Sequence, residues 1–209
     1  APASGCAGIS SPAPDRGGFT SATIRACRIS NPQRSYRFAA REGESLMRPY
    51  RAWWVVASAS AGRWHWRDFF RNPEEEGRNW GGREWIRSPV SWARIREMRK
   101  GDMVVAYQAG EGIIGLARLA SDGYPEVEGG PYDTFDLAPA PTVWLHEPVP
   151  LFLVRQIPRA RDHFEFLRVH HGTVFRITPE GFEALLRLIR ALNPEQAQEL
   201  QTFLGERDG

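Results

Sequence analysis

Short apolar runs separated by turn residues predict that most of the middle of the chain forms β-strands. Ala52–Ser58 reads AWWVVAS, an aromatic and β-branched run that is typical of a buried strand. Met103–Gln108 and Ile113–Ala120 are joined by Ala109-Gly-Glu-Gly112, whose glycines indicate a hairpin turn. Three shorter runs complete the predicted strands: Thr142–His146, Val149–Val154 and Thr173–Ile177.

Helical periodicity appears in fewer segments. Ser88–Lys100 has Pro89 and Ser91 near its start, and Gly101 stands where a glycine often ends a helix. Thr178-Pro179 begins a second helix, and its apolar residues share one face: Phe182, Leu185, Leu186 and Ile189. Asn193-Pro194 ends this helix, and Gln196–Leu204 is a last helical segment. Earlier in the chain, Trp64–Phe70 fits either a short helix or an aromatic loop. The order of elements predicts an α+β fold around one mostly antiparallel sheet or open β-barrel, with flanking helices.

The domain organisation follows from where the pattern begins and ends. Residues 1–46 are rich in Ala, Ser, Gly and Pro without a period, so we expect a disordered or extraneous segment before a natural start at Met47. Residues 47–192 then form one domain, and 193–209 form a C-terminal helical tail. The chain has no long apolar run and no secretory signal pattern, which predicts a cytoplasmic protein that does not contact membranes.

Charge is distributed unevenly although the net charge is only +2. Residues 48–101 carry a net charge of +6, and residues 102–209 carry −7. A basic surface favours a polyanion such as nucleic acid, because neutralised phosphates supply much of the sequence-independent affinity. An ordinary solvated surface fits the same asymmetry.

Several familiar kinds of catalytic or cofactor site are not indicated. Gly110-Glu-Gly-Ile-Ile-Gly115 matches the dinucleotide-binding fingerprint, but a strand follows it where a helix is required. The adjacent His170 and His171 point to different sides of any regular element, so a metal site that also includes His163 is not expected. Both cysteines, Cys6 and Cys27, precede the predicted domain. We therefore expect no metal, no cofactor and no enzymatic activity, with a hydrolase as the least favoured alternative.

Tryptophan and arginine alternate in the basic part of the chain. Seven of the eight tryptophans lie between Trp53 and Trp92, with arginines among them. Indole rings stack on any base, and guanidinium groups hold phosphates. One of Trp53 and Trp54, together with Trp92, is expected in the core, whereas four others lie near glycine, arginine and asparagine and are expected to line a pocket: Trp64, Trp66, Trp80 and Trp85. Five arginines are the predicted phosphate ligands: Arg63, Arg67, Arg78, Arg83 and Arg87.

Six segments, taken in order and spacing, resemble an EVE domain, a member of the PUA-like superfamily related to YTH and ASCH domains. They are WWVVASAS from Trp53, NWGG from Asn79, IREMRKGDMVVAY from Ile95, GIIGLAR from Gly112, GYP from Gly123 and VFRITPE from Val174. The resemblance covers about Arg51 to Leu188. It implies a twisted β-barrel with flanking helices and a pocket for an extruded base. Such relatives bind, or are proposed to bind, modified cytosines or adenines, often beside nucleases.

Two matched positions locate the pocket that the resemblance implies. Ser58 and Ala59 follow the first strand where the family often has Lys-Ser-Glu, and Trp80-Gly81 matches the Trp-Asp-Gly stretch in which YTH relatives place a cage tryptophan. Alanine replaces the lysine and the glutamate, and Gly81 replaces the aspartate, so Ser58 and Gln108 are expected to bond the base edge. The predicted base-binding pocket is Ser58, Ala59, Trp64, Trp66, Trp80, Gly81, Trp85, Tyr107 and Gln108.

The resemblance thus implies a non-enzymatic reader of 5-methylcytosine, 5-hydroxymethylcytosine or N6-methyladenine in DNA or RNA, with modified DNA favoured over RNA. The base would leave its stack and enter the aromatic pocket. The alternative is an adaptor whose acidic segment from Glu180 to Asp208 recruits a nuclease or another effector protein.

Overall fold

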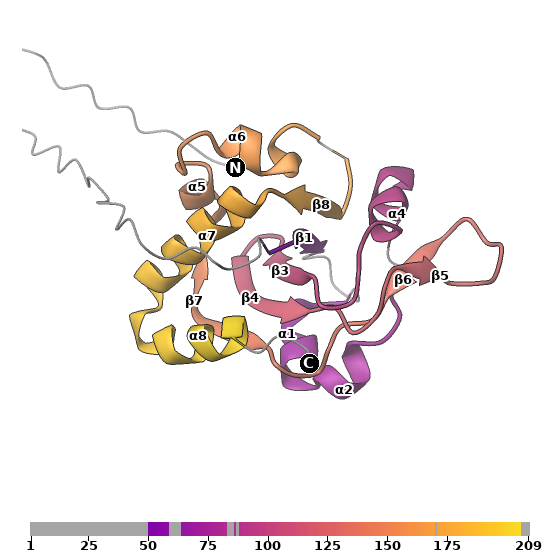
Figure 1. The fold of residues 1–209 in the computed structure, drawn as a ribbon, viewed down its shortest axis with the longest axis horizontal. Helices are drawn as coiled ribbons and strands as arrows, with labels where there is room; N and C mark the ends of the chain where they lie inside the picture. Colours follow the sequence, from indigo (N-terminus) through magenta and orange to yellow (C-terminus); the bar gives the residue numbers. More distant parts are fainter. Residues whose placement is uncertain (1–49, 59–63, 83–85, 87, 170, 206–209) are drawn as a thin grey trace, which may run out of the picture. The chain divides into compact units, whose positions relative to one another are not determined.

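A five-stranded mixed sheet lies at the centre of the computed structural model, which describes residues 50–58, 64–82, 86, 88–169 and 171–205 (Figure 1). Its strands, in spatial order, are β7 (Val143–Val149), β4 (Gly112–Arg118), β3 (Met103–Gln108), β1 (Ala52–Ala57) and β8 (Val174–Ile177). β1 pairs in parallel with β3, and the other neighbouring pairs are antiparallel.

A smaller antiparallel sheet consists of β2 (Trp80–Gly81), β6 (Asp133–Phe135) and β5 (Tyr124–Pro125), in that order. An isolated bridge between Leu119 and Leu137 links the chain after β4 to the chain after β6. The expected α+β class with mostly antiparallel pairing is confirmed. Among the described residues, however, the strand pairings do not close into a barrel.

The central strands β1 and β3 are apolar on both faces because helices and loops cover both sides of the sheet. Trp53 and Trp54 point to opposite faces, as successive strand residues must, and each is 1% exposed. Only one of the two was expected in the core, and the structure buries both. Trp54 belongs to one apolar cluster and Trp53 to the other, so the sheet separates two cores.

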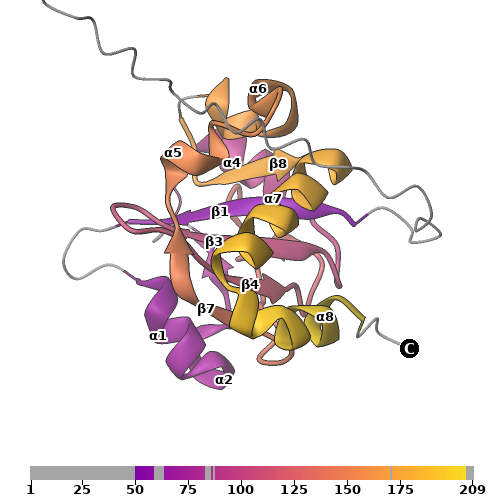
Figure 2. The ribbon, with the colours of Figure 1, turned by 90° about the vertical axis from the view of Figure 1, so that its left-hand side faces the viewer.

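Helices near the C-terminus cover the face to which Trp54 points (Figure 2). They are α5 (Leu151–Val154), α6 (Ala160–His163), α7 (Pro179–Leu192) and α8 (Ala197–Gly205), with 3₁₀ turns η1 (Glu165–Leu167) and η2 (Pro194–Gln196). Thr178 caps α7, accepting a hydrogen bond from the Gly181 backbone N–H. The predicted apolar face of α7 is confirmed: Phe182, Leu185, Leu186 and Ile189 are buried.

The opposite face is covered by α1 (Trp66–Arg71), α4 (Pro89–Ile95) and the small sheet, with α2 (Pro73–Glu76) following α1 (Figure 1). Trp66 and Phe69 of α1 and Ile95 of α4 are fully buried there. No described helix combines the length and apolar character that spanning a membrane requires.

Two predicted boundaries are wrong, and each has a local cause. The predicted strand Val149–Val154 is instead the end of β7 followed by helix α5, which begins after Pro150. The helix predicted over Ser88–Lys100 ends at Ile95. After it, backbone N–H groups donate to carbonyls three residues earlier, and the Asp102 carboxylate accepts the Arg99 N–H. The predicted hairpin is confirmed: β3 and β4 pair directly, so the glycine fingerprint leads into a strand.

Side-chain amides cover the outer edge of β7. Asn193 Oδ1 accepts the Glu147 N–H at 2.8 Å, and Asn193 Nδ2 donates to the Glu147 carbonyl at 3.1 Å. Gln196 forms the corresponding pair, accepting from His146 N–H at 2.8 Å and donating to the Trp144 carbonyl at 3.0 Å. Both amides are buried, and they occupy backbone groups that an edge strand otherwise leaves open.

Candidate nucleic-acid interface

The C-terminal ends of β1 and β3 lie side by side because the two strands run parallel, with Ala57 opposite Gln108. Gln108 is fully buried. Its Oε1 accepts the Trp66 backbone N–H at 3.1 Å, and its Nε2 donates to the Ser58 carbonyl at 2.9 Å. Gln108 therefore fastens the start of α1 to the end of β1. In this structure both ends of the amide are bonded to the chain, and its contact with a base edge stays a prediction.

Two of the predicted pocket tryptophans belong to the core. Trp66 is fully buried and Trp80 is 6% exposed. Their rings lie nearly parallel with centroids 5.9 Å apart, and Phe135 packs 5.0 Å from Trp80. A base cannot enter between Trp66 and Trp80 in this arrangement, because sandwiching a flat ring needs about twice the aromatic stacking distance. These two rings therefore leave no slot for a base between them.

Trp64, Trp66 and Trp80 form one aromatic group, here called the Trp64 cluster. Of these three rings, that of Trp64 remains partly accessible. It is half-buried, with its ring edge-on to Trp66 at 4.7 Å and to Trp80 at 5.7 Å. Its Nε1 donates to a Glu76 carboxylate oxygen at 3.1 Å, which fixes the ring orientation. Trp66 and Trp80 thus support an indole that lies at the surface, close in sequence to the end of β1.

Tyr107 lies on the other face of the sheet from the Trp64 cluster. Its ring contacts Trp54 at 4.9 Å, and Trp54 stacks on Phe166 at 4.2 Å. Burial raises the pKa of Tyr107, and the positive charge of Arg155 opposes that rise. The predicted pocket includes both Tyr107 and Gln108, but successive strand residues face opposite sides of a sheet.

Gly81 has a local structural reason to be glycine. Its φ of 124° lies in a region that side chains rarely adopt, and a Cβ there would lie 3.0 Å from the Asp133 carbonyl oxygen. The neighbouring Trp80 carbonyl accepts the Thr134 hydroxyl at 3.0 Å. An aspartate side chain at this position would crowd β6, because β2 packs closely against it.

The predicted phosphate ligands are described only in part. Arg67 and Arg78 are exposed, and Arg67 forms an ion pair with Glu111 that reduces its free positive charge. The remaining predicted residues lie outside the described part of the chain: Ala59, Arg63, Arg83, Trp85 and Arg87. Their roles stay predictions. The described residues contain no cluster of three or more metal-ligating side chains.

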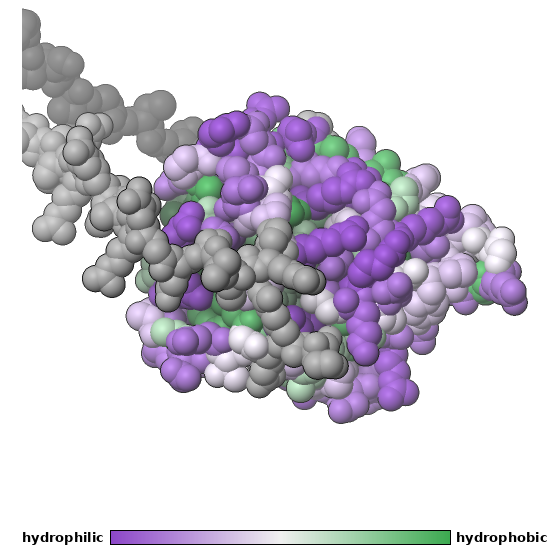
Figure 3. Space-filling model, in the orientation of Figure 1, coloured by the Kyte–Doolittle hydropathy of each residue, from purple (hydrophilic) through white to green (hydrophobic). Residues whose placement is uncertain are grey.

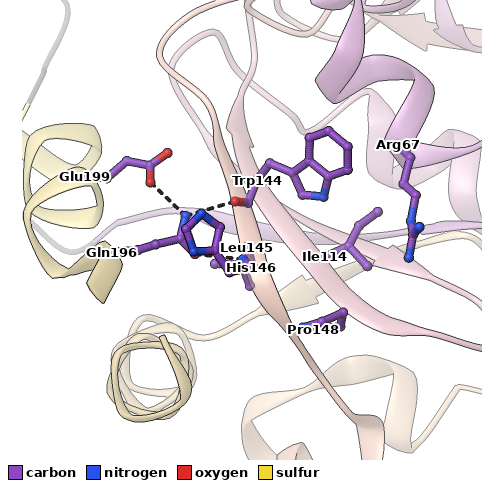
Figure 4. A pocket seen from close by; sticks show the side chains of 8 residues that line it. All are labelled: Arg67, Ile114, Trp144, Leu145, His146, Pro148, Gln196 and Glu199. Carbon is purple, nitrogen blue, oxygen red and sulfur yellow. Dashed lines mark hydrogen bonds between the residues drawn. The ribbon is translucent and has the colours of Figure 1, made fainter. Parts of the chain in front are cut away.

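The sequence pattern missed an accessible tryptophan, Trp144, on the edge strand β7. It is 37% exposed, stacks on Phe70 at 6.2 Å, and has the Arg71 guanidinium 5.9 Å from its ring. It lines a hollow of about 430 Å³ (Figure 4), together with Arg67, Ile114, Leu145, His146, Pro148, Gln196 and Glu199. In the sequence, Trp144 has no tryptophan or arginine close to it. Its exposure in the structure is therefore what identifies it as a candidate site residue.

A second unpredicted feature is a group of arginines in the acidic half of the chain. Arg155, Arg159 and Arg161 line a hollow of about 610 Å³ whose other residues are Ile157, Ala160, Phe166 and Leu167. The net charge of −7 over residues 102–209 concealed this local concentration. A count over the short segment 155–161 would have shown it.

Comparison with known proteins identifies the fold. No family model matches the chain, and no curated protein matches it. Among solved structures, Atu2648 from Agrobacterium tumefaciens matches with a TM-score of 0.54 and 20% identity, covering 66% of this chain and 92% of that one. Rpa0253 from Rhodopseudomonas palustris matches with a TM-score of 0.51 and 23% identity over 69% and 94%. Human THYN1, solved in complex with 5-methylcytosine-containing DNA, matches with a TM-score of 0.56 and 14% identity over 66% and 97%. The chain therefore shares the α+β fold of these three proteins.

Proposed function

We propose that this protein is a non-enzymatic reader of a modified base, with DNA as the favoured ligand. The observation that carries the proposal is the half-buried Trp64 ring, which two buried tryptophans support beside the end of β1. The likeness to a fold solved with 5-methylcytosine-containing DNA supports the same assignment. A rigid, partly exposed indole offers a stacking surface for a base that has left its helix.

The proposed pocket lies at the C-terminal ends of β1 and β3. Trp64 supplies the stacking face, and Ser58 lies at the end of the strand that leads towards it. Ala59 and Trp85 complete this pocket in the proposal, and Arg67 and Arg78 hold the backbone phosphates. Trp66, Trp80 and Gln108 act behind this surface, because their contacts fix the position of Trp64 and the start of α1.

The reader is preferred to the adaptor because of the last helix. An adaptor that docks an effector through its C-terminal segment needs exposed apolar residues there. The apolar residues of α8, Leu200, Phe203 and Leu204, are instead buried in the core beneath the sheet. This segment offers a polar outer surface, whereas the Trp64 region offers an aromatic one.

Replacing Trp64 by alanine is expected to weaken binding of an oligonucleotide with one modified cytosine by about 5- to 150-fold, because stacking contributes about 1–3 kcal/mol. Titration followed by tryptophan fluorescence, with matched modified and unmodified oligonucleotides, measures the change. Trp144→Ala is the matched control, since it removes another partly exposed indole. An equal loss in both variants would place the base elsewhere, and no binding of either oligonucleotide by the unaltered protein would reject the reader.

A further inference from the structure

The hollow between α5, α6 and η1 has the composition of an anion site with an apolar floor. Its rim carries Arg155, Arg159 and Arg161, and Phe166 and Leu167 provide apolar surface. Strongly hydrophilic residues surround α6 at the top of the view in Figure 3. The hollow in Figure 4 differs in charge, because Glu199 lines it and Glu111 pairs with its arginine, Arg67.

The positive charge of this rim is largely uncompensated. Arg159 pairs with Asp162 at 2.9 Å, but within the described residues neither Arg155 nor Arg161 has a carboxylate partner. The neighbouring carboxylate of Glu165 is buried and already bound by Arg94 and Arg176. Two exposed guanidinium groups therefore remain available, and guanidinium geometry suits bidentate contact with phosphate.

The backbone at Arg159 also sets this rim apart from an ordinary solvated loop. Arg159 has φ of 57° and ψ of 30°, in the left-handed region that residues other than glycine and asparagine rarely adopt. Such residues concentrate at ligand-binding sites, where the surrounding structure holds them in place. Here the conformation starts α6 and places Arg159 and Arg161 on the same short turn.

Aromatic contacts connect the hollow to the sheet end that carries the proposed base pocket. Phe166 stacks on Trp54, and Trp54 contacts Tyr107 next to the end of β3. Tyr107 lies opposite Val56 in the parallel pair, one residue before the Ala57–Gln108 pair beside Ser58. The hollow lies on the Trp54 face of the sheet and Trp64 on the opposite face. A strand whose base is held near Trp64 would therefore pass around the shared end of β1 and β3 to reach α5 and α6.

We propose that Arg155, Arg159 and Arg161 form a phosphate-binding site for the nucleic-acid strand that carries the read base, with Phe166 contacting one flanking nucleotide. This inference rests on the proposed function, because it assigns the backbone contacts of the same ligand. Phosphate contacts fix register and orientation but carry no base information. The site should therefore contribute to affinity without contributing to the preference for a modified base.

The test compares Arg155→Gln/Arg161→Gln with the control Arg187→Gln/Arg190→Gln, which removes two exposed arginines of α7. Affinities for matched modified and unmodified oligonucleotides are measured by fluorescence anisotropy over a range of salt concentrations. We expect the slope of log affinity against log salt to become shallower by about two in the first variant, about one per phosphate contact. The control should keep the slope of the unaltered protein, and the ratio between the two oligonucleotides should stay constant throughout.

Two results would overturn the phosphate site: an unchanged slope in the first variant, or an equal change in the control. A loss of preference between the oligonucleotides without a change in slope would also overturn it, since the hollow would then contact the base. If the unaltered protein shows no preference but the slope still falls in the first variant only, the reader is wrong and the phosphate site stands. Thermal unfolding of both variants checks that they fold.

Discussion

Replacing Glu165 by leucine is expected to lower the free energy of unfolding by about 3–5 kcal/mol, because it leaves a buried guanidinium without its partner. Arg94 contacts both carboxylate oxygens of Glu165, with Nε at 2.6 Å, and its side chain is only 11% exposed. The Arg176 backbone N–H also donates to Glu165, at 2.9 Å. This ion pair joins α4 to η1 and β8, which lie about seventy residues later in the sequence.

The same carboxylate predicts how stability depends on pH. Burial alone would raise the pKa of Glu165, but the hydrogen bonds and charges of Arg94 and Arg176 outweigh burial and hold the pKa below its usual value. A carboxyl group whose pKa is lowered in the folded state stabilises that state above its unfolded pKa, about 4.3. This contribution is lost as the pH falls below that value through the folded pKa. Urea unfolding at pH 7 and pH 3 should therefore show a smaller difference between the unaltered protein and Glu165→Gln at pH 3.

Glu97 provides the matched control, since it also pairs with Arg176 but is 40% exposed. Glu97→Gln should cost less than about 1 kcal/mol, as exposed ion pairs usually do. If Glu97→Gln and Glu165→Leu lowered the free energy of unfolding equally, burial would not be the source of the effect.

Replacing Asn193 by leucine is expected to lower the free energy of unfolding by about 2–4 kcal/mol, because each buried polar group left unbonded costs about 1–3 kcal/mol. Asn193 is fully buried, and it bonds both backbone groups of Glu147 and the Ile189 carbonyl. The variant should also self-associate more, since its β7 edge becomes available for pairing. Denaturant unfolding and sedimentation velocity measure the two effects.

Gln198→Ala is the control for this second prediction, because Gln198 is exposed on α8. It should change the free energy of unfolding by less than about 0.5 kcal/mol. A similarly small change for Asn193→Leu would show that water replaces the lost hydrogen bonds at this edge.

The parts of the fold that could be predicted depend on local sequence. The β3–β4 hairpin follows from its glycine turn, and α7 follows from Thr178-Pro179 and its apolar period. The parallel pairing of β1 with β3 could not be predicted, because it joins residues about fifty positions apart. The extent of β7 was also missed, since Pro148 argues against a strand unless the strand lies at an edge.

The candidate site was less predictable than the fold because burial of an indole depends on tertiary packing. Trp66 and Trp80 have few aliphatic neighbours in the sequence, which suggested exposure, but their core partners are other aromatic rings. Trp64 has the same kind of neighbours and remains half-buried. The distinction arises because Trp66 lies on the inner face of α1 and Trp64 precedes the helix.

The position of β1 in the sheet has a consequence for synthesis of the protein. β1 is the first described strand, yet its two partners are β3 and β8, and β8 ends only at Ile177. While the ribosome extends the chain, one side of β1 therefore has no partner until most of the domain has been made. Native pairing of such distant segments is slow, and unpaired strand edges favour aggregation. A nascent chain that is released before β8 emerges would expose β1 along that side.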